Sequence, residues 1–288
     1  MKVTGFTFIR NAIKYEYPII ESITSILPIC DAFVVAVGNS DDDTLNLIRG
    51  IDPDKITIIE TVWDDSLRTD GKVLAIETDK AFRAIAEDSD WNFYIQGDEV
   101  VHEKYLDTIY SAMKKWKDNT EVDGLLFKYM HFYGSYDYIG ASTQWYRHEI
   151  RVVKNNKNIY SYRDAQGFRK GNNEKLNVKA IDAYIYHYGW VREPKALQRK
   201  QLDFNRLWHD DAWIDRNIKK GEEFDYTGID ALNKFTGTHP KVMQNLINRK
   251  NWTFEFDLTF NKLSVKDSAK LLLEKIGIKV GYKNYRIY

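Results

Sequence analysis

The chain has 288 residues and carries 42 Lys or Arg against 42 Asp or Glu, so its formal net charge at pH 7 is zero. A chain of this length can bury a large core, and 43% hydrophobic with 29% charged residues is the composition of a folded globular protein, which excludes general disorder. The balanced charge argues against a nucleic-acid partner, and the single cysteine, Cys30, excludes an intramolecular disulfide and a thiolate metal cluster.

The first hundred residues alternate between predicted strands and predicted helices. Strands are expected at residues 2–9, 32–37, 55–60 and 91–95, and helices at residues 15–27, 45–49 and 71–87. This alternation is typical of parallel βαβ units with right-handed crossovers. The sequence therefore predicts an α/β fold with a Rossmann-like, mostly parallel sheet flanked by helices.

Two adjacent acids, Asp98 and Glu99, end the fourth predicted strand. In an open α/β sheet, ligands bind at the carboxyl ends of the strands, and carboxylates there suit a hard cation such as Mg2+ or Mn2+. Asp98 is therefore a candidate metal anchor. The alternative is that both acids only cap the helix that follows, since acids favour helix N-termini.

The chain changes character after residue 193. Before that point we expect a helix at 103–117, strands at 123–134, 144–153 and 183–190, and a polar binding loop or lid at 160–175. Beyond it, helices are expected at 194–220, 241–249 and 264–276. We therefore divide the chain into a domain at residues 1–192 and a mainly helical extension at 193–288.

The last predicted helix leaves two interpretations open. Apolar residues such as Leu272, Ile276 and Ile278 lie in a stretch where basic residues outnumber acids. The stretch could contact a membrane surface, or it could pack back on the domain with a solvated face. No stretch has the length and apolarity of a membrane span or a signal peptide, so we expect a cytoplasmic protein, with peripheral contact at the inner face of a membrane as the variant.

Four short motifs lie where the predicted strands end. They are Arg10-Asn11, Ser40-Asp41-Asp42-Asp43-Thr44, Thr69-Asp70-Gly71-Lys72 and Gln96-Gly97-Asp98-Glu99. The glycine patterns of dinucleotide and P-loop sites are missing from the sequence. In order and spacing, the motifs resemble those of the family 2 glycosyltransferases of the GT-A fold, in the branch with a helical C-terminal extension. The resemblance covers roughly the first 190 residues, 1–192 being the domain assigned above.

The resemblance implies a role for each of a set of residues. Nucleotide-sugar binding falls to Arg10, Asn11, Asn39, Ser40, Asp42, Gly71, Lys72, Gln96, Gly97 and Arg151. Asp98 and His187 would hold Mn2+ or Mg2+, although a histidine at that position could also be a core residue. Asp164 is the candidate catalytic base with Asp182 in reserve, and Tyr133, Trp145 and Trp190 are candidates for stacking on acceptor sugars unless they belong to the core.

Two departures from the family pattern leave the donor open. Gln96 stands where the family has the first Asp of its Asp-x-Asp motif. No Asp lies near Val37 or Gly38 to recognise a base, although Asn39 could bond a base edge. The identity of the nucleotide is therefore not predicted.

The resemblance implies a metal-dependent, inverting glycosyltransferase of the hexosyltransferase type, active in polysaccharide biosynthesis. Its donor would be a nucleotide-diphosphate sugar, and its acceptor a glycan, a lipid-linked glycan or another hydroxyl compound. One alternative is a catalytically weakened nucleotide- or glycan-binding module of the same fold, which Gln96 keeps open. Another is a sugar nucleotidyltransferase, which usually has a glycine-rich phosphate loop after the first strand that this chain lacks.

Overall fold

A computed structural model describes residues 1–218, 221–260, 262–275 and 283–288. Within these residues, eleven strands form one sheet and three more form a small second sheet. The strands of the main sheet are β1 (Val3–Ile9), β2 (Ala32–Gly38), β3 (Ile56–Thr61), β4 (Trp91–Tyr94), β5 (Glu99–Val101), β6 (Gly124–Tyr133), β7 (Ser135–Gly140), β8 (His148–Lys154), β12 (Asn177–Trp190), β13 (Leu232–Lys234) and β14 (Arg286–Ile287). The second sheet contains β9 (Ile159–Tyr162), β10 (Gly167–Lys170) and β11 (Glu174–Lys175).

The N-terminal half of the main sheet is parallel. Strand β1 lies between β2 and β4, with β3 on the far side of β2, and all three pairings are parallel. Strand β8 then pairs antiparallel with both β4 and β6, while β12 runs parallel to β6 and antiparallel to β5. The carboxyl ends of β1, β2 and β4 therefore meet at one edge, as predicted for consecutive βαβ units.

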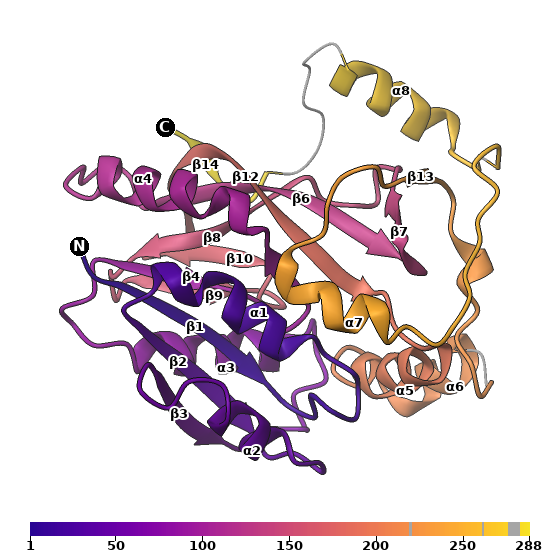
Figure 1. Ribbon diagram of the computed structural model, residues 1–288, viewed down its shortest axis with the longest axis horizontal. Coiled ribbons are helices and arrows are strands. Elements are labelled where there is room, and N and C mark those ends of the chain that lie inside the picture. The colour runs from indigo at the N-terminus through magenta and orange to yellow at the C-terminus, as the bar shows by residue number, and fades with distance from the viewer. Residues whose placement is uncertain (219–220, 261, 276–282) are drawn as a thin grey trace.

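The helices of the described chain lie on both faces of the sheet and around its carboxyl edge (Figure 1). They are α1 (Ile19–Ile26), α2 (Thr44–Arg49), α3 (Lys72–Arg83), α4 (Leu106–Trp116), α5 (Pro194–Asn205), α6 (Asp211–Asn217), α7 (Gln244–Asn248) and α8 (Val265–Lys275), with short 3-10 turns at Leu27–Ile29, Glu103–Tyr105, Tyr226–Gly228 and Lys241–Met243. None of these helices combines the length and the apolar composition needed to cross a bilayer.

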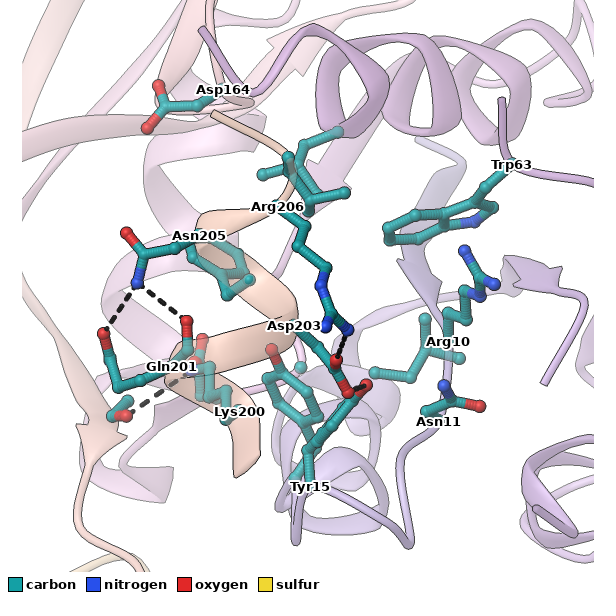
Figure 2. A pocket seen from close by; sticks show the side chains of 18 of the residues that line it. Arg10, Asn11, Tyr15, Trp63, Asp164, Lys200, Gln201, Asp203, Asn205 and Arg206 are labelled. Carbon is teal, nitrogen blue, oxygen red and sulfur yellow. Dashed lines mark hydrogen bonds and ion pairs between the residues drawn. The ribbon is translucent and has the colours of Figure 1, made fainter. Parts of the chain in front are cut away.

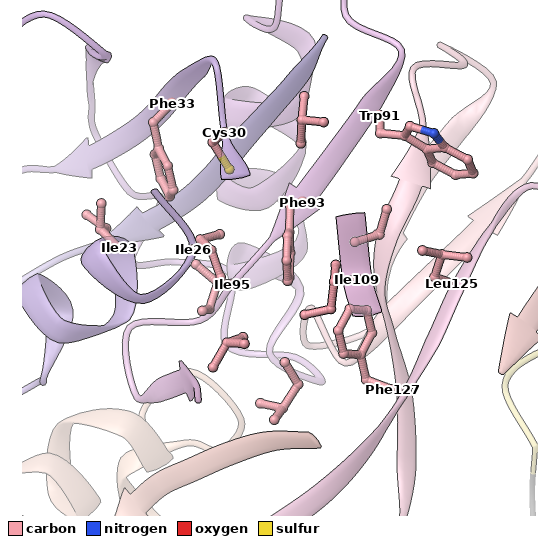
Figure 3. Packing of buried hydrophobic residues seen from close by; sticks show 14 of the residues in the cluster. Ile23, Ile26, Cys30, Phe33, Trp91, Phe93, Ile95, Ile109, Leu125 and Phe127 are labelled. Carbon is pink, nitrogen blue, oxygen red and sulfur yellow. The ribbon is translucent and has the colours of Figure 1, made fainter. Parts of the chain in front are cut away.

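Alternation along the strands divides the core into two layers. On β2, Phe33 and Val35 pack in the cluster that includes α1 and α4, whereas Val34 and Ala36 pack in the cluster that includes α3. Successive side chains of a strand point to opposite faces, so an unbroken apolar strand must be covered on both. Figure 3 shows the first layer, in which Phe93 lies between helix α1 and the strands that follow β4. The predicted α/β fold with flanking helices is confirmed.

Several boundaries differ from the sequence predictions. The strand expected at 183–190 is the end of the longer β12, and the loop expected at 160–175 contains the small second sheet. Helix α1 begins only at Ile19, because the preceding residues form the loop that leaves β1. These segments have weak periodicity in sequence, and long-range pairing decides their structure.

The segment after residue 193 is not an independent helical unit. Helices α5 to α8 are present, but β13 pairs with β7 and β14 pairs with β12, so the segment also contributes to the main sheet. On α8, Val265 and Leu272 are exposed. The predicted apolar residues Ile276 and Ile278 lie outside the described residues.

A buried acid on β8 generates a prediction about stability. The side chain of Glu149 is 3% exposed; its Oε1 accepts from Gln166, and its Oε2 has no hydrogen-bond partner among the described residues. Burial is the main cause that raises the pKa of Glu149 from 4.5 to about 8. Between these two values the unfolded chain releases a proton that the folded chain keeps. The contribution of Glu149 to the free energy of unfolding is therefore greatest below about pH 4.5 and falls as the pH rises to about 8, by at most about 1.4 kcal/mol per pH unit.

We expect Glu149→Gln to remove this pH dependence. Urea unfolding from pH 5 to pH 8.5 should show the variant gaining stability relative to the wild type as the pH rises, with Glu60→Gln as a control at an exposed position of β3. Parallel wild-type and variant curves over this range would contradict the assignment.

Candidate functional site

A cavity of about 740 Å³ opens at the carboxyl ends of β1 and β4. Its walls are the loop after β1, the loop between β3 and α3, the residues after β4, the end of β12, and helix α5 with the turn that follows it. Figure 2 shows α5 crossing the cavity, with Asp164 on one side and Arg10 on the other. The predicted site residues that line it are Arg10, Asn11, Gln96, Gly97, Asp98, Asp164, His187 and Trp190.

Asp98 lies in this cavity among three nitrogen-bearing side chains. Its Oδ2 is 3.1 Å from Lys200 Nζ and 3.6 Å from an Arg192 Nη atom, and its Oδ1 is 3.7 Å from His187 Nε2. Burial alone would raise the pKa of Asp98, but Lys200 and Arg192, joined by His187 at pH values where its ring is protonated, outweigh it and hold that pKa far below its usual value. Asp98 is therefore a buried carboxylate that stays ionised.

The two histidines beside Asp98 are held neutral by burial. Burial lowers the pKa of His187 and, more strongly, that of His131. Their Nδ1 atoms are 3.2 Å apart, and His131 Nε2 lies 2.9 Å from the carbonyl oxygen of Tyr146. Since strands β6 and β12 pair in register at these residues, the fold itself brings the two rings together.

The residues present do not fit a resident metal ion at Asp98. Among the side chains that the structure describes, no group of three or more His, Cys, Asp or Glu is arranged to hold a metal. Asp98 and His187 are the two ligands that the family resemblance implied, but Asp98 Oδ2 already contacts the Lys200 ammonium. A divalent cation about 4 Å from an ammonium is repelled by roughly 8 kcal/mol at an effective dielectric constant of 20.

Glycine at position 189 makes this close arrangement feasible. A Cβ there would lie 2.5 Å from His187 Cε1 and 3.1 Å from Asp98 Oδ2. The carbonyl oxygen of Gly189 also accepts from Lys200 at 3.5 Å and from Arg192 at 3.3 Å. The backbone at the end of β12 therefore holds both cations beside the carboxylate.

The adjacent acid, Glu99, points into the core instead. Its two oxygens accept from Arg151 Nε at 2.8 Å and Nη2 at 2.7 Å, and Tyr129 donates to it at 2.7 Å. Glu99 and Arg151 are both fully buried. Arg151 was predicted to contact the nucleotide, but its guanidinium is committed to Glu99 and does not line the cavity.

Gln96 holds the loop that carries Asp164. Gln96 Nε2 donates to the carbonyl oxygen of Ala165 at 3.2 Å. On either side of Asp164, Arg163 and Ala165 have positive φ values of 57° and 63°, which side chains adopt at a cost and which cluster at functional sites. Burial raises the pKa of Asp164, as suits a group that must accept a proton. The Gln96 amide therefore donates a hydrogen bond that a carboxylate at this position could not donate.

One end of the cavity is aromatic and carries an ion pair. Arg10 bonds Asp65 through two nitrogens, at 2.6 and 3.3 Å, and its guanidinium lies 5.5 Å from the Trp63 ring centroid. Arg10 Nε also donates to the backbone oxygen of Asn39. Trp63 and Asp65 were missed in the sequence analysis. The signal was an aromatic residue and acids directly after the third strand, at the carboxyl edge of the sheet.

Other predicted nucleotide contacts tie loops together. Ser40 Oγ accepts from the backbone of Asn11, and Asp42 accepts from the backbone of Lys14 and of Thr44. Asn39 Oδ1 accepts from the backbone of the residue at position 63. Asn39, Ser40 and Asp42 do not line the cavity. They fix the loops after β1 and β2. The loop after β1 carries Arg10 and Asn11, whose side chains line the cavity.

Three further candidates lie outside the lining. Gly71 has φ +62°, and a Cβ there would lie 2.9 Å from Asp164 Cβ, so it packs beneath the Asp164 loop. Lys72, the first residue of α3, is exposed. Asp182, the reserve base, has a side chain 83% exposed and pairs with Lys128 at 2.7 Å, away from the cavity.

Of the aromatic residues predicted to stack on acceptor sugars, one lines the cavity and two lie in the core. Trp190 lines the cavity and is partly buried. Tyr133 and Trp145 lie in an aromatic cluster with Tyr226, where Tyr133 packs edge-on against Tyr226 at 5.3 Å. Of the three, Trp190 is the one placed to contact a ligand in the cavity.

Helix α5 covers the cavity and is fastened at several points. Tyr15 donates to Asp203 at 2.5 Å, and Lys14 lies 3.4 Å from the same carboxylate. Beyond the helix, Arg68 pairs with Asp211 at 2.8 Å. Lys200, which the sequence analysis also missed, lies on the buried face of α5 because it follows Leu197 by three positions. A lysine at an apolar position of a predicted helix was the available signal.

Comparisons with known proteins find only distant likenesses. No family model and no curated protein matches the sequence. Among solved structures, TarS 1-349 from S. aureus is similar at 14% identity and TM-score 0.41, over 70% of this chain and 64% of that chain, so this chain spans less than two thirds of its length.

Two other solved structures show weaker likenesses. A 4-diphosphocytidyl-2C-methyl-D-erythritol synthase from Anaerococcus prevotii is similar at 8% identity and TM-score 0.34, over 54% of this chain and 70% of that chain. Glucosyl-3-phosphoglycerate synthase from Mycobacterium tuberculosis, in complex with Mn2+, UDP and phosphoglyceric acid, is similar at 18% identity and TM-score 0.30, over 45% and 43% of the two chains. All these likenesses are too distant to assign a function, so the proposal below rests on the cavity.

We expect Gln96→Glu to loosen the Asp164 loop. The variant keeps the side-chain length but faces the carbonyl oxygen of Ala165 with an acceptor, which should cost about 1–3 kcal/mol of stability. Hydrogen exchange should show faster opening of residues 163–167. Gln201→Glu is the matched control, because Gln201 lines the same cavity and its Oε1 accepts from Asn205. Unchanged exchange in Gln96→Glu would contradict the role given to Gln96.

Proposed function

We propose that this protein is a glycosyltransferase that moves a sugar from a nucleoside-diphosphate donor to a hydroxyl group of an acceptor. The carrying observation is the arrangement of charge in one cavity. Two buried cations surround Asp98 at the carboxyl edge of a parallel sheet, and a half-buried acid, Asp164, lies in the same cavity. The cations would stabilise the negative charge of a diphosphate leaving group, and the acid would take the proton of a hydroxyl nucleophile.

The residues that line the cavity suggest where the base, the diphosphate and the sugar of the donor would lie. Trp63 and the Arg10–Asp65 pair form an end suited to a base, because the indole offers a stacking face and the ion pair offers donors and acceptors. Lys200 lies on α5, which crosses the cavity in Figure 2, and Asp98 is 3.1 Å from it. Asp164 and Trp190 complete the part that would hold the transferred sugar and the acceptor.

The chemistry that follows is a single displacement. The acceptor oxygen attacks the anomeric carbon, the bond from that carbon to the diphosphate oxygen breaks with its electron pair, and Asp164 takes the acceptor proton. Such a displacement inverts the anomeric configuration. Residues 1–192 would supply the donor-binding edge of the sheet, and residues 193–288 would supply its cover through α5.

A panel of nucleoside diphosphates and nucleotide sugars tests this function. A ligand that binds only the folded state raises its melting temperature, in proportion to RT ln(1 + [L]/Kd). We expect at least one donor to stabilise the protein and to be hydrolysed or transferred slowly. Binding without any turnover would indicate a nucleotide-binding module instead of an enzyme. If no member of the panel binds, the proposed function is refuted.

The proposed base gives a direct prediction. Asp164→Asn should leave donor affinity nearly unchanged and lower turnover about 10²- to 10⁴-fold, the usual contribution of a general base. Wild-type turnover should rise with pH through a pKa above the ordinary value of an aspartate, because burial raises the pKa of Asp164. Asp182→Asn is the control at an exposed acid. Equal turnover in wild type and Asp164→Asn would exclude Asp164 as the base.

The end of the cavity that would bind the nucleotide base gives another prediction. Trp63→Ala should weaken binding of a nucleoside diphosphate by about 1–3 kcal/mol, the range for stacking of a base on an aromatic ring, and should leave pyrophosphate binding unchanged. Isothermal titration calorimetry compares the two ligands. Equal loss for both would show that Trp63 supports the cavity as a whole rather than the base.

A further inference from the structure

We propose that the Lys200 ammonium, oriented by Asp98 and supported by Arg192, supplies the positive charge that neutralises the donor diphosphate, in place of a divalent metal ion. The inference rests on the proposed function and adds to it a catalytic residue from the C-terminal segment. It replaces the Mn2+ or Mg2+ site that the sequence resemblance implied at Asp98 and His187.

The charges around Asp98 sum to a positive value. Burial lowers the pKa of Lys200 to about 8, so below that pH Asp98 contributes one negative charge and Lys200 and Arg192 one positive charge each, at 3.1 and 3.6 Å from the same oxygen. His187 adds none, because its buried ring is neutral. The cluster is therefore a net cation before any ligand binds, which favours an anion and disfavours a second cation.

The other cations of the cavity are already paired with acids. Arg10 is paired with Asp65, and Lys14 lies 3.3 Å from Asp41 and 3.4 Å from Asp203. Arg206 also bonds Asp203, so this acid, like Asp98, is shared between two cations. Lys200 differs from these surface cations in being buried beside a carboxylate that it shares with a second buried cation, Arg192.

Lys200 is the member of the cluster that can touch a ligand. It lines the cavity, whereas Arg192 does not. An ammonium has three donors, and the acceptors found for it among the described residues are Asp98 Oδ2 at 3.1 Å and the carbonyl oxygen of Gly189 at 3.5 Å. One donor is left without a hydrogen-bond acceptor among the described residues, and the ammonium lies 4.8 Å from the centroid of the Tyr17 ring, which also lines the cavity. The two acceptors fix the position of the Lys200 ammonium. It therefore needs no rearrangement when negative charge develops on the leaving oxygen.

Arg192 and Asp98 act through Lys200 and are positioning residues. Arg192 donates to the carbonyl oxygens of Gly189 and Glu16, and its guanidinium lies over the Tyr17 ring at 4.3 Å. Its charge prevents Asp98 from cancelling that of Lys200. Asp98 in turn keeps two buried cations from repelling each other. In the transfer step Lys200 forms no covalent bond and keeps its proton, while the electron pair of the broken bond stays on the diphosphate.

The test uses the full chain and two probes measured by calorimetry in the presence of EDTA. Inorganic pyrophosphate reports on the anion site alone, and UDP, GDP and CDP report on the nucleotide site. We expect wild-type protein to bind pyrophosphate without metal, with an affinity that Mn2+ does not raise. A separate titration with Mn2+, followed by electron paramagnetic resonance, should show no specific site in the protein.

Three variants locate the charge. Lys200→Met should weaken pyrophosphate binding roughly 10- to 100-fold, as expected for loss of a charged hydrogen bond. Lys200→Arg should retain most of the affinity, because it keeps the charge, and it also guards against misfolding of the Met variant. Lys195→Met is the matched control, since Lys195 lies on the same helix but is half-exposed and outside the cavity.

The outcomes separate this inference from the proposed function. Metal-free binding of pyrophosphate that needs Lys200, together with metal-free binding of a nucleotide, supports the inference. Pyrophosphate binding at Lys200 with no nucleotide binding shows an anion site but overturns the proposed function, and with it the role of Lys200 at a donor diphosphate. Nucleotide binding that EDTA abolishes and Mn2+ restores, or equal pyrophosphate affinity in wild type and Lys200→Met, overturns the inference while leaving the proposed function in place. Failure of pyrophosphate and every nucleotide to bind overturns both.

Discussion

A buried carboxylate must be compensated, and the arrangement of this protein around Asp98 follows from that requirement. Asp98 ends up at the carboxyl edge of the parallel strands with almost no contact with water. Its partner Lys200 lies 102 positions later in the chain. Removing one partner from a buried ion pair costs about 3–5 kcal/mol, so the position of α5 is coupled to that of the sheet edge. The interaction that places α5 also encloses the cavity.

Two adjacent acids of one motif have different partners, because Asp98 lies in the turn between β4 and β5 whereas Glu99 is the first residue of β5. Asp98 faces the cavity and its cations. Glu99 faces the interior, where Arg151 and Tyr129 satisfy both of its oxygens. This second ion pair fastens the start of β5 to β8, and the Tyr129 hydrogen bond fastens it to β6. The geometry of the site therefore depends on two buried ion pairs that lie back to back.

Most of the fold and part of the site could be predicted from the sequence. The strands from Val3 to Tyr94 are short runs rich in β-forming residues, separated by helical periodicity, so both their existence and their parallel order were readable. Asp98 was predicted because the end of a buried strand has a known place in such a sheet, whereas Arg10 and Gln96 were implied by the family resemblance; all three line the cavity. The boundaries of β12 and of the small second sheet were not readable, because their pairing is with distant strands.

Several site residues were misplaced or missed for the same physical reason. Arg151 has the charge of a phosphate contact, but which acid it pairs with depends on the register of β8 against β4 and β6. Lys200 belongs to a highly charged helical segment, and Arg192 directly precedes that segment. The apolar position of Lys200 on its helix was the local signal, and it does not tell which acid the lysine meets. Their partners are distant in sequence, and pairing of charges across such distances has no local signature.

The sequence by itself determined the α/β class, the edge at which a ligand would bind and the acid at its centre, because these depend on local periodicity and on where strands end. Only the tertiary structure decided what faces that acid. Packing of α5 against the sheet edge puts the Lys200 ammonium beside Asp98, where a metal ion was expected, and the Arg192 guanidinium comes from the residues directly after β12. Together the two cations turn a predicted cation site into the proposed site for an anion. The sign of the charge at Asp98 is a property of the assembled cavity, since it is the sum of groups that only folding brings together.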